Sequence, residues 1–400
     1  MTLVMTCRQS LGVSSYHGGV TRSSGSTRLT APQPVLNHPS RVPEHLASDS
    51  DPRFCMGVYL IDKEGSFDTL SVFVNLPENG PMFAQTPADP ESSESHNSLA
   101  EQILALFRPL PGIKALKIFA PATSSARKFL VQLEPARQLF VGSAFKTFVL
   151  CEALRLVDSP KVVDQLTTKT QLALNQAVWS PDSQTLNPPN VIGMISERLA
   201  LEAMIMHSDN TATDVSILQT GIQNVRSFIS SIGLTQTLVP DSTRAFFGYL
   251  FGAPNYLSIT WAQLQGYLNS DARFVNSPLN KTITLASSME DLVSYYSQAL
   301  MGDFFRHSET LQEYRRILTL GDAVLRIVPL GATGFGKGGS IDVPGFHAVC
   351  VAGGMFFSGR WAFFALTINW FDPAENDPDT VAAFATAVKQ ALNLVFERLP

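Results

Sequence analysis

The feature of the sequence that most restricts its fold is the order of hydrophobic periods after residue 98. Residues 99–107 and 377–399 have the spacing of amphipathic helices, and most of residues 154–320 also repeat at helical period. Strand-like segments lie at residues 113–120, 128–133, 334–340, 346–357 and 361–370. This order predicts an α/β chain of the α+β type, in which one antiparallel sheet is flanked by the terminal helices and carries an inserted all-helical lobe.

The sequence divides into three parts. Residues 1–50 are rich in Ser, Thr, Pro and Gly, which is typical of a disordered leader. Residues 51–97 form a small N-terminal extension with two strand-like runs, followed by a linker over residues 77–97. Residues 98–400 form the main domain, and a hydrophobic content of 45% is enough to give it a substantial core.

Charge and cysteine usage restrict the possible partners. A net charge of -5 without a basic stripe argues against a nucleic-acid partner, and we expect a small-molecule substrate instead. We find no membrane-spanning segment and no signal peptide, so the chain as written is expected to be cytoplasmic, or periplasmic or secreted if its start is misassigned. Neither the four cysteines nor the seven histidines show a ligand spacing, so we predict no metal and no cofactor.

A first candidate motif is Ser143-Ala144-Phe145-Lys146, at the start of a predicted helix. Three residues are close to one helical turn, so the lysine can reach the serine hydroxyl, and a buried neutral amine can accept its proton. About one such pair is expected by chance, and a second pair, Ser125 and Lys128, exists. Only Ser143 is followed by an apolar helical run, whereas Ser125 lies in a turn between strands.

Two further motifs complement the first. Ser208-Asp209-Asn210 supplies a hydroxyl that can relay a proton and a carboxamide that can hold a lysine and a substrate carbonyl. Near the C-terminal end, Lys337-Gly338-Gly339-Ser340 supplies a fixed positive charge on a strand whose glycines allow a substrate to lie against the backbone. The backbone N–H of Ser340 can join that of Ser143 as an oxyanion hole.

Together the three motifs resemble the S-x-x-K, S-D-N and K-T-G set of class A β-lactamases and penicillin-binding proteins. The resemblance spans about residues 98–400 and is particularly close in the run EAMIMHSDNTATDVSIL. It implies the β-lactamase and transpeptidase fold, with Ser143 as the acylated nucleophile and Lys146 as its base. It further implies that Ser208 is the proton shuttle, Asn210 a contact to substrate and lysine, and Lys337 the anchor of a substrate carboxylate, beside Gly339 and Ser340.

Two departures leave the substrate open. Gly338 stands where the family has Thr, which removes a hydroxyl that would contact a substrate carboxylate. No glutamate lies between Glu202 and Glu290, so the deacylating glutamate of class A enzymes is missing, and Asp241 is the nearest acid, either as a water-activating base or in a turn. We therefore expect β-lactam or related amide hydrolysis, with an esterase, acyltransferase or peptidase, or a penicillin-binding sensor without turnover, as alternatives.

The stretch of residues 245–270 is uncharged and rich in Phe, Tyr and Leu, and it looks like an insertion. Two interpretations are open. It either extends the core of the helical lobe or forms an apolar lid that selects a lipophilic acyl group.

Overall fold

The computed structural model describes residues 54–61, 67–74, 91–124, 126–270 and 272–399. The described residues divide into two compact units, one of residues 91–399 and the other of residues 54–61 and 67–74. In the smaller unit, β1 (Phe54–Ile61) pairs with β2 (Phe67–Val74) in an antiparallel register. Two strands were predicted here, although the second begins three residues earlier than expected. The predicted leader, residues 1–50, lies outside the described residues.

The main unit is built on a five-stranded antiparallel sheet in the order β4-β3-β11-β10-β9. Its strands are β3 (Ile113–Ala120), β4 (Phe129–Leu133), β9 (Thr333–Val343), β10 (Phe346–Phe357) and β11 (Arg360–Trp370). β3 pairs with β11 and β4 pairs with β3, so strands from both ends of this unit form one antiparallel sheet, as predicted. β9 lies at the open edge of this sheet, and it carries the third motif.

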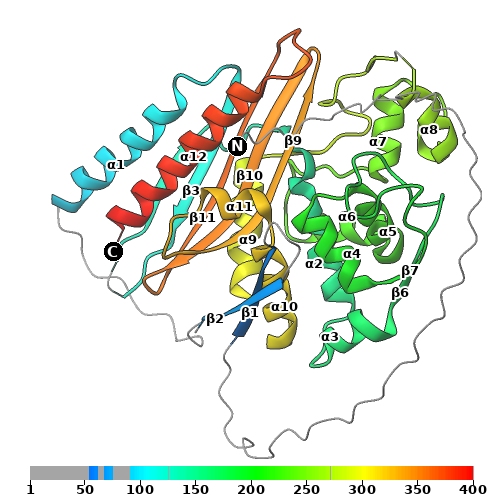
Figure 1. The fold of residues 1–400 in the computed structure, drawn as a ribbon. Helices are drawn as coiled ribbons and strands as arrows, with labels where there is room; N and C mark the ends of the chain where they lie inside the picture. Colours follow the sequence, from blue (N-terminus) through cyan, green and yellow to red (C-terminus); the bar gives the residue numbers. More distant parts are fainter. Residues whose placement is uncertain (1–53, 62–66, 75–90, 125, 271, 400) are drawn as a thin grey trace, which may run out of the picture. The chain divides into compact units, whose positions relative to one another are not determined.

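The two terminal helices, α1 (Glu91–Phe107) and α12 (Pro378–Arg398), cover one face of the sheet (Figure 1). Phe107 packs edge-to-face on Phe384, and both side chains are buried with the sheet residues of that face. The predicted linker ended at residue 97, but α1 already begins at Glu91. Its first turns contain Ser, Glu and His without apolar spacing, so their composition is that of a linker although they continue the helix.

The other face of the sheet carries α9 (Met289–Met301) and the helical lobe. The longer helices of this part are α2 (Lys146–Leu156), α4 (Glu197–Met206), α5 (Asn210–Thr220), α6 (Ile222–Ser231), α7 (Thr243–Leu250), α8 (Trp261–Leu268) and α10 (Ser308–Thr319). The lobe was predicted to be all-helical. It also contains a short antiparallel pair, β6 (Gln171–Leu174) and β7 (Gly193–Ser196), which are too short for a clear alternating pattern.

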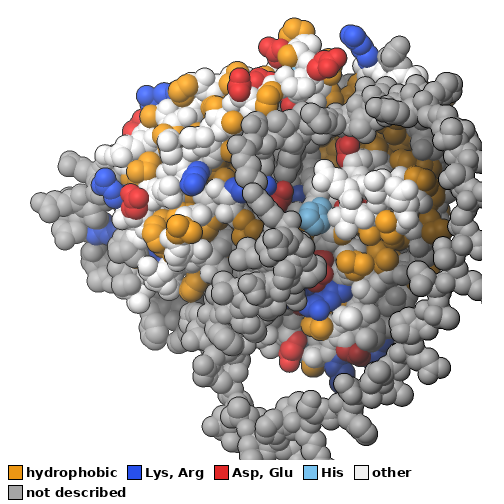
Figure 2. Space-filling model, viewed as in Figure 1, with side chains coloured by type: hydrophobic (Ala, Val, Ile, Leu, Met, Phe, Trp, Pro, Cys, Tyr) orange, Lys and Arg blue, Asp and Glu red, His pale blue; other side chains and the backbone are white. Residues whose placement is uncertain are grey.

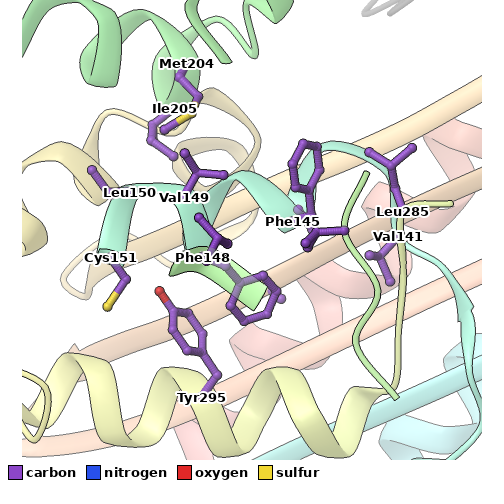
Figure 3. Close-up of a cluster of buried hydrophobic side chains, with 14 of the residues drawn as sticks. Val141, Phe145, Phe148, Val149, Leu150, Cys151, Met204, Ile205, Leu285 and Tyr295 are labelled. Atoms are coloured by element: carbon purple, nitrogen blue, oxygen red, sulfur yellow. The ribbon is translucent and has the colours of Figure 1, made fainter. Parts of the chain in front are cut away.

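Helix α2 lies at the centre of the larger core (Figure 3). Phe148 and Val149 have no exposed surface, and the Phe148 ring lies 4.6 Å from that of Tyr295 on α9. On another side, α2 packs against Met204 and Ile205 near the end of α4. Burying several large apolar side chains, each worth about 1.5–3 kcal/mol, fixes the helix that begins at Lys146 relative to the loop after α4.

The insertion of residues 245–270 packs into the lobe. Phe246 is 3% exposed and stacks on Phe140 of the main core, and Phe251 is buried in a small cluster with Ile259 and Leu264. These contacts favour the interpretation of the insertion as additional core, because Phe246 and Phe251, whose rings an apolar lid would present to a substrate, are covered by the lobe itself.

Charged side chains of both signs are interspersed on the face of the molecule shown in Figure 2. Within the described ranges, none of the helices combines the length and apolar character that crossing a bilayer requires.

Candidate functional site

Ser143 lies in a 3-10 turn, Gly142–Phe145, that leads directly into α2. The preceding strand β5 (Leu139–Phe140) is held by reciprocal hydrogen bonds between the backbone of Phe140 and the side-chain amide of Asn369 on β11. The chain then turns at Gly142, whose φ of +53° favours glycine. This turn presents the half-buried Ser143 side chain beside the sheet.

Lys146 follows Ser143 by one 3-10 turn, and its backbone N–H donates to the Ser143 carbonyl. Since residues i and i+3 of a 3-10 turn are eclipsed, both side chains project from the same side. The Lys146 side chain has no exposed surface, and its Nζ donates to Asn210 Oδ1 at 2.7 Å, to the Ser208 carbonyl at 2.5 Å and to Ser208 Oγ at 3.3 Å. The first two motifs, predicted from separate parts of the chain, therefore meet at one amine.

The surroundings of Lys146 hold its pKa well below its usual value. Burial is the largest cause, and the positive charge of Lys337 adds to it, although Asp209 and Asp214 act in the opposite direction. A lowered pKa increases the fraction of neutral amine, and a neutral amine can accept a proton. The Ser143 hydroxyl forms no hydrogen bond with any residue of the described part, so its own proton is not committed elsewhere in the fold.

Ser208 lies in the tight turn between α4 and α5, with a φ of +57°. A left-handed conformation at a residue other than glycine costs on the order of 1 kcal/mol or more, so the surrounding contacts must impose it. Asp209 supplies them: its Oδ1 caps α5 at the Ala212 N–H, and its Oδ2 accepts the N–H groups of Thr185 and Leu186. Asp209, which has no exposed surface, is thus a scaffold for the turn.

Asn210 begins α5 and is 7% exposed. Its Nδ2 donates to the Pro181 carbonyl at 2.9 Å, which leaves Oδ1 facing Lys146. Behind it, Thr243 Oγ1 bonds the Asn210 carbonyl and the carboxylate of Asp214. Asp214 and Thr243 were not predicted as site residues from the sequence. The first turns of α5 bury several polar side chains, and buried polar groups need hydrogen-bond partners of this kind.

The third motif approaches the first through the backbone of β9. A Cβ added at Gly339 would lie 2.5 Å from the Ser143 nitrogen and 2.2 Å from the Val141 carbonyl oxygen. On the other side, a Cβ at Gly142 would lie 2.8 Å from the Ser340 nitrogen. The two glycines therefore allow the 3-10 turn and the edge strand to come close enough to place the Ser143 and Ser340 nitrogens in the same small region.

Lys337 lies on β9 with 2% of its surface exposed. Its Nζ donates to the carbonyl of the next residue, Gly338, at 2.9 Å. Burial lowers the pKa of Lys337 to about 8, although the carboxylate of Asp322 acts to raise it. Lys337 also lowers the pKa of Lys146, so the charges of the two lysines are electrostatically coupled.

Asp241 pairs with Arg226 of α6, with 3.1 Å between Oδ1 and Nη1, and its side chain is 41% exposed. The carboxylate is therefore engaged in an ion pair. Arg244, in the first turn of α7, donates to the carbonyls of Gln176, Ala177 and Trp179. These contacts join the start of α7 to residues 176–179, and they place a cation in the stretch where the class A resemblance predicts a deacylating acid.

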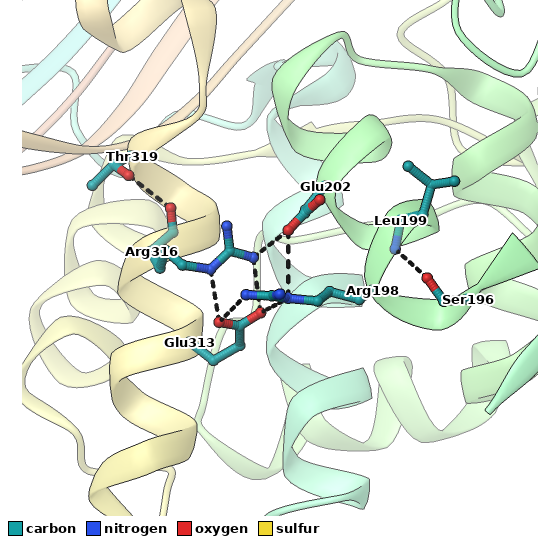
Figure 4. A network of polar contacts seen from close by, with 7 residues as sticks. All are labelled: Ser196, Arg198, Leu199, Glu202, Glu313, Arg316 and Thr319. Carbon is teal, nitrogen blue, oxygen red and sulfur yellow. Dashed lines mark hydrogen bonds and ion pairs between the residues drawn. The ribbon is translucent and has the colours of Figure 1, made fainter. Parts of the chain in front are cut away.

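A network of ion pairs fixes α4, the helix that ends at the second motif (Figure 4). Glu313 of α10 is 3% exposed and accepts hydrogen bonds from Arg198 and Arg316. Arg316 also contacts Glu202, which is one further turn along α4. Burial alone would raise the pKa of Glu313, but its bonds to Arg316 and Arg198 outweigh this effect and lower it.

Residues 98–282 match the model of the family described as "Beta-lactamase enzyme family". Over this part, the chain is similar to the β-lactamase and penicillin-binding-protein superfamily. No curated protein matches the chain.

Solved structures of this superfamily share the fold. A class A β-lactamase from Bacteroides cellulosilyticus is 17% identical, with a TM-score of 0.57 over 76% of this chain and 98% of its own. The TLA-3 extended-spectrum β-lactamase is 13% identical, with a TM-score of 0.56 over 76% and 98%. PBP-A is 17% identical, with a TM-score of 0.51 over 75% and 95%. At these identities the likeness establishes the β-lactamase and transpeptidase fold, which confirms the predicted architecture.

Within the described ranges, no three His, Cys, Asp or Glu side chains are grouped as a metal site requires. The two described cysteines with placed side chains, Cys151 and Cys350, are buried free thiols, and burial raises the pKa of both. A raised pKa keeps a thiol protonated, so neither is an activated nucleophile.

Proposed function

We propose that the protein is a serine hydrolase that forms a covalent acyl-enzyme on Ser143. The observation that carries this proposal is the position of Lys146, which is buried, holds a lowered pKa and is bonded to both Ser208 and Asn210. A structural lysine would be paired with a carboxylate or exposed, whereas this one is kept available as a base.

In the proposed acylation, neutral Lys146 accepts the proton of Ser143 as Oγ attacks the carbonyl carbon of the acyl donor. The N–H groups of Ser143 and Ser340 hold the developing oxyanion. The leaving group departs with a proton delivered through Ser208 from the lysine ammonium, and the acyl group remains esterified to Ser143. Asn210 positions the lysine and the substrate carbonyl, and the backbone beside Gly339 aligns the donor with β9.

β-Lactam or related amide hydrolysis is one outcome of this chemistry, and ester hydrolysis, acyl transfer or peptide hydrolysis are others on the same scaffold. A second candidate is a sensor that acylates once without turnover. It is favoured by the groups after the second motif, where Arg244 is bonded to backbone carbonyls and Asp241 is paired with Arg226. If no acid activates water, deacylation is slow.

The test is the intact mass of the protein after incubation with a fluorescent penicillin and, separately, with a panel of p-nitrophenyl esters. The wild type is compared with Ser143→Ala and with the matched control Ser125→Ala, which alters the other S-x-x-K pair. We expect an adduct in the wild type and in Ser125→Ala that is missing in Ser143→Ala. An adduct that decays with product release indicates a hydrolase, and a persistent one indicates the sensor or a transferase. An adduct that survives in Ser143→Ala would refute the proposal.

A further inference from the structure

The third motif lies between two different surroundings. An added Cβ at Gly339 would meet the turn that carries Ser143, whereas an added Cβ at Gly338 would lie 2.6 Å from the Cβ of Ala323, on α11 (Asp322–Ile327). Real Cβ contacts are not that short, so α11 leaves no room for a side chain at position 338. In the family, a threonine at this position supplies a hydroxyl that contacts a substrate carboxylate. Here the position is glycine, and Ala323 leaves no room for a larger side chain.

The start of α11 is fixed in this position by backbone packing. A Cβ at Gly321 would lie 2.5 Å from the Gly336 carbonyl oxygen, so the chain before α11 rests directly on β9. On the opposite side of β9, the register of β10 places Val351 beside Gly338 and Val349 beside Ser340. Ala323, Val351 and Val349, which lie beside Gly338 and Ser340 on these two elements, are thus apolar where a carboxylate would need donors.

The charge at this position is also unfavourable to a carboxylate. Asp322 lies between Gly321 and Ala323, both of which face β9, and its Oδ1 accepts the Ala323 N–H at 2.7 Å. It therefore brings a negative charge to the part of β9 that carries Lys337. Lys337 itself is buried, and its Nζ donates to the Gly338 carbonyl.

We propose that this site takes acyl donors that have no carboxylate beside the reacting carbonyl, which means neutral esters or neutral amides. The proposal rests on the acylation of Ser143 proposed above and names its substrate class. A donor carboxylate at the third motif would lose its hydration without gaining a hydrogen bond from a threonine hydroxyl, and the negative charge of Asp322 would oppose it. Lys337 then serves the electrostatics of Lys146 instead of anchoring the substrate.

A matched pair of donors tests this selection. The acylation rate of the wild type is measured by intact mass with benzylpenicillin and with its methyl ester, which differ only in the carboxylate. We expect the methyl ester to acylate Ser143 about tenfold faster or more. A third donor, p-nitrophenyl butyrate, has neither the carboxylate nor the β-lactam ring. It identifies a site that accepts neutral esters but no β-lactam. Faster acylation by p-nitrophenyl butyrate than by benzylpenicillin also supports the proposal.

The variant Asp322→Asn, with the exposed Asp303→Asn as its matched control, tests the role of the negative charge. We expect Asp322→Asn to reduce the preference for the methyl ester over benzylpenicillin by about fivefold, and Asp303→Asn to leave that ratio as in the wild type. Equal or faster acylation by benzylpenicillin would overturn the substrate class while leaving acylation of Ser143 in place. No adduct from any of the three donors would overturn the proposed function, and the substrate class with it.

Discussion

Lys146 Nζ donates a 2.7 Å hydrogen bond to Asn210 Oδ1, across a sequence separation of 64 residues. This bond joins α2, which carries the nucleophile motif, to the first residue of α5. Both residues are buried, so the amine and the carboxamide are held in one relative position by the packing of two helices. The position of Lys146, the proposed base, is thus set by the packing of the fold, and variants that disturb it should change the acylation rate.

Asn210→Ala removes the acceptor of Lys146 and the donor to the Pro181 carbonyl. We expect the acylation rate to fall about 100-fold, because a misplaced base loses its alignment, and the free energy of unfolding to fall by about 1–3 kcal/mol. The rate is followed by intact mass and the stability by urea unfolding. Asn224→Ala, which also removes an amide bonded to a backbone carbonyl, is the control and should leave acylation intact. Normal acylation in Asn210→Ala would contradict the assigned role.

The acylation rate should depend on pH through Lys146. Because the neutral amine is the base, the rate rises with pH and levels off above the pKa of Lys146, which burial and Lys337 hold well below 10.5. Lys337→Gln removes a positive charge that lowers this pKa, so the rise should move to higher pH. Lys128→Gln, whose amine lies over the Phe119 ring, is the control and should leave the profile in place. A shift to lower pH in Lys337→Gln would contradict the coupling of the two lysines.

Gly339→Ala should separate β9 from the nucleophile turn. Its Cβ would lie 2.2 Å from the Val141 carbonyl oxygen and 2.6 Å from the Ala144 nitrogen, so one of the two segments must move. We expect acylation to fall about 100-fold or more, as when an oxyanion-hole donor is lost. Gly266→Ala, on α8 with open space around it, is the control and should stabilise the fold by about 0.5–1 kcal/mol. Acylation at the wild-type rate in Gly339→Ala would argue against the close approach.

Glu313→Gln should destabilise the protein by about 3 kcal/mol near neutral pH, because it leaves Arg198 and Arg316 without their buried partner. The pKa of Glu313 is lowered in the folded state, so its contribution is present above the pKa of the unfolded chain and is lost as pH falls through the folded value. The difference between wild type and variant in urea unfolding should therefore shrink in acid. Glu101→Gln, which breaks an exposed pair with Arg108, should cost only about 0.2–1 kcal/mol.

The sequence predicted the main elements well where hydrophobic period and length agree. The segment of residues 113–120 was predicted as a strand and forms β3 with the same bounds. The short strands β6 and β7 and the first turns of α1 were not predicted, because four residues carry too little periodicity and the start of α1 has a linker-like composition. Hydrophobic periodicity predicts least well the elements whose stability depends on tertiary contacts.

For the site, sequence order identified which motifs belong together but not how they meet. That Ser143 and Lys146 share one side follows from their spacing. The approach of Gly339 to the Ser143 nitrogen, and the occupation of the space above Gly338 by Ala323, depend on packing between distant segments. No spacing in the sequence contains this information, and the proposed exclusion of a donor carboxylate rests on this packing.

The most direct test of the account is the location of the acyl group. After incubation with p-nitrophenyl butyrate or benzylpenicillin methyl ester, the protein is digested and the modified peptide is sequenced by tandem mass spectrometry. The account predicts a single modified residue, Ser143, in the peptide that also contains Lys146. Acylation at Ser208, at Ser340 or at a residue outside the three motifs would contradict it.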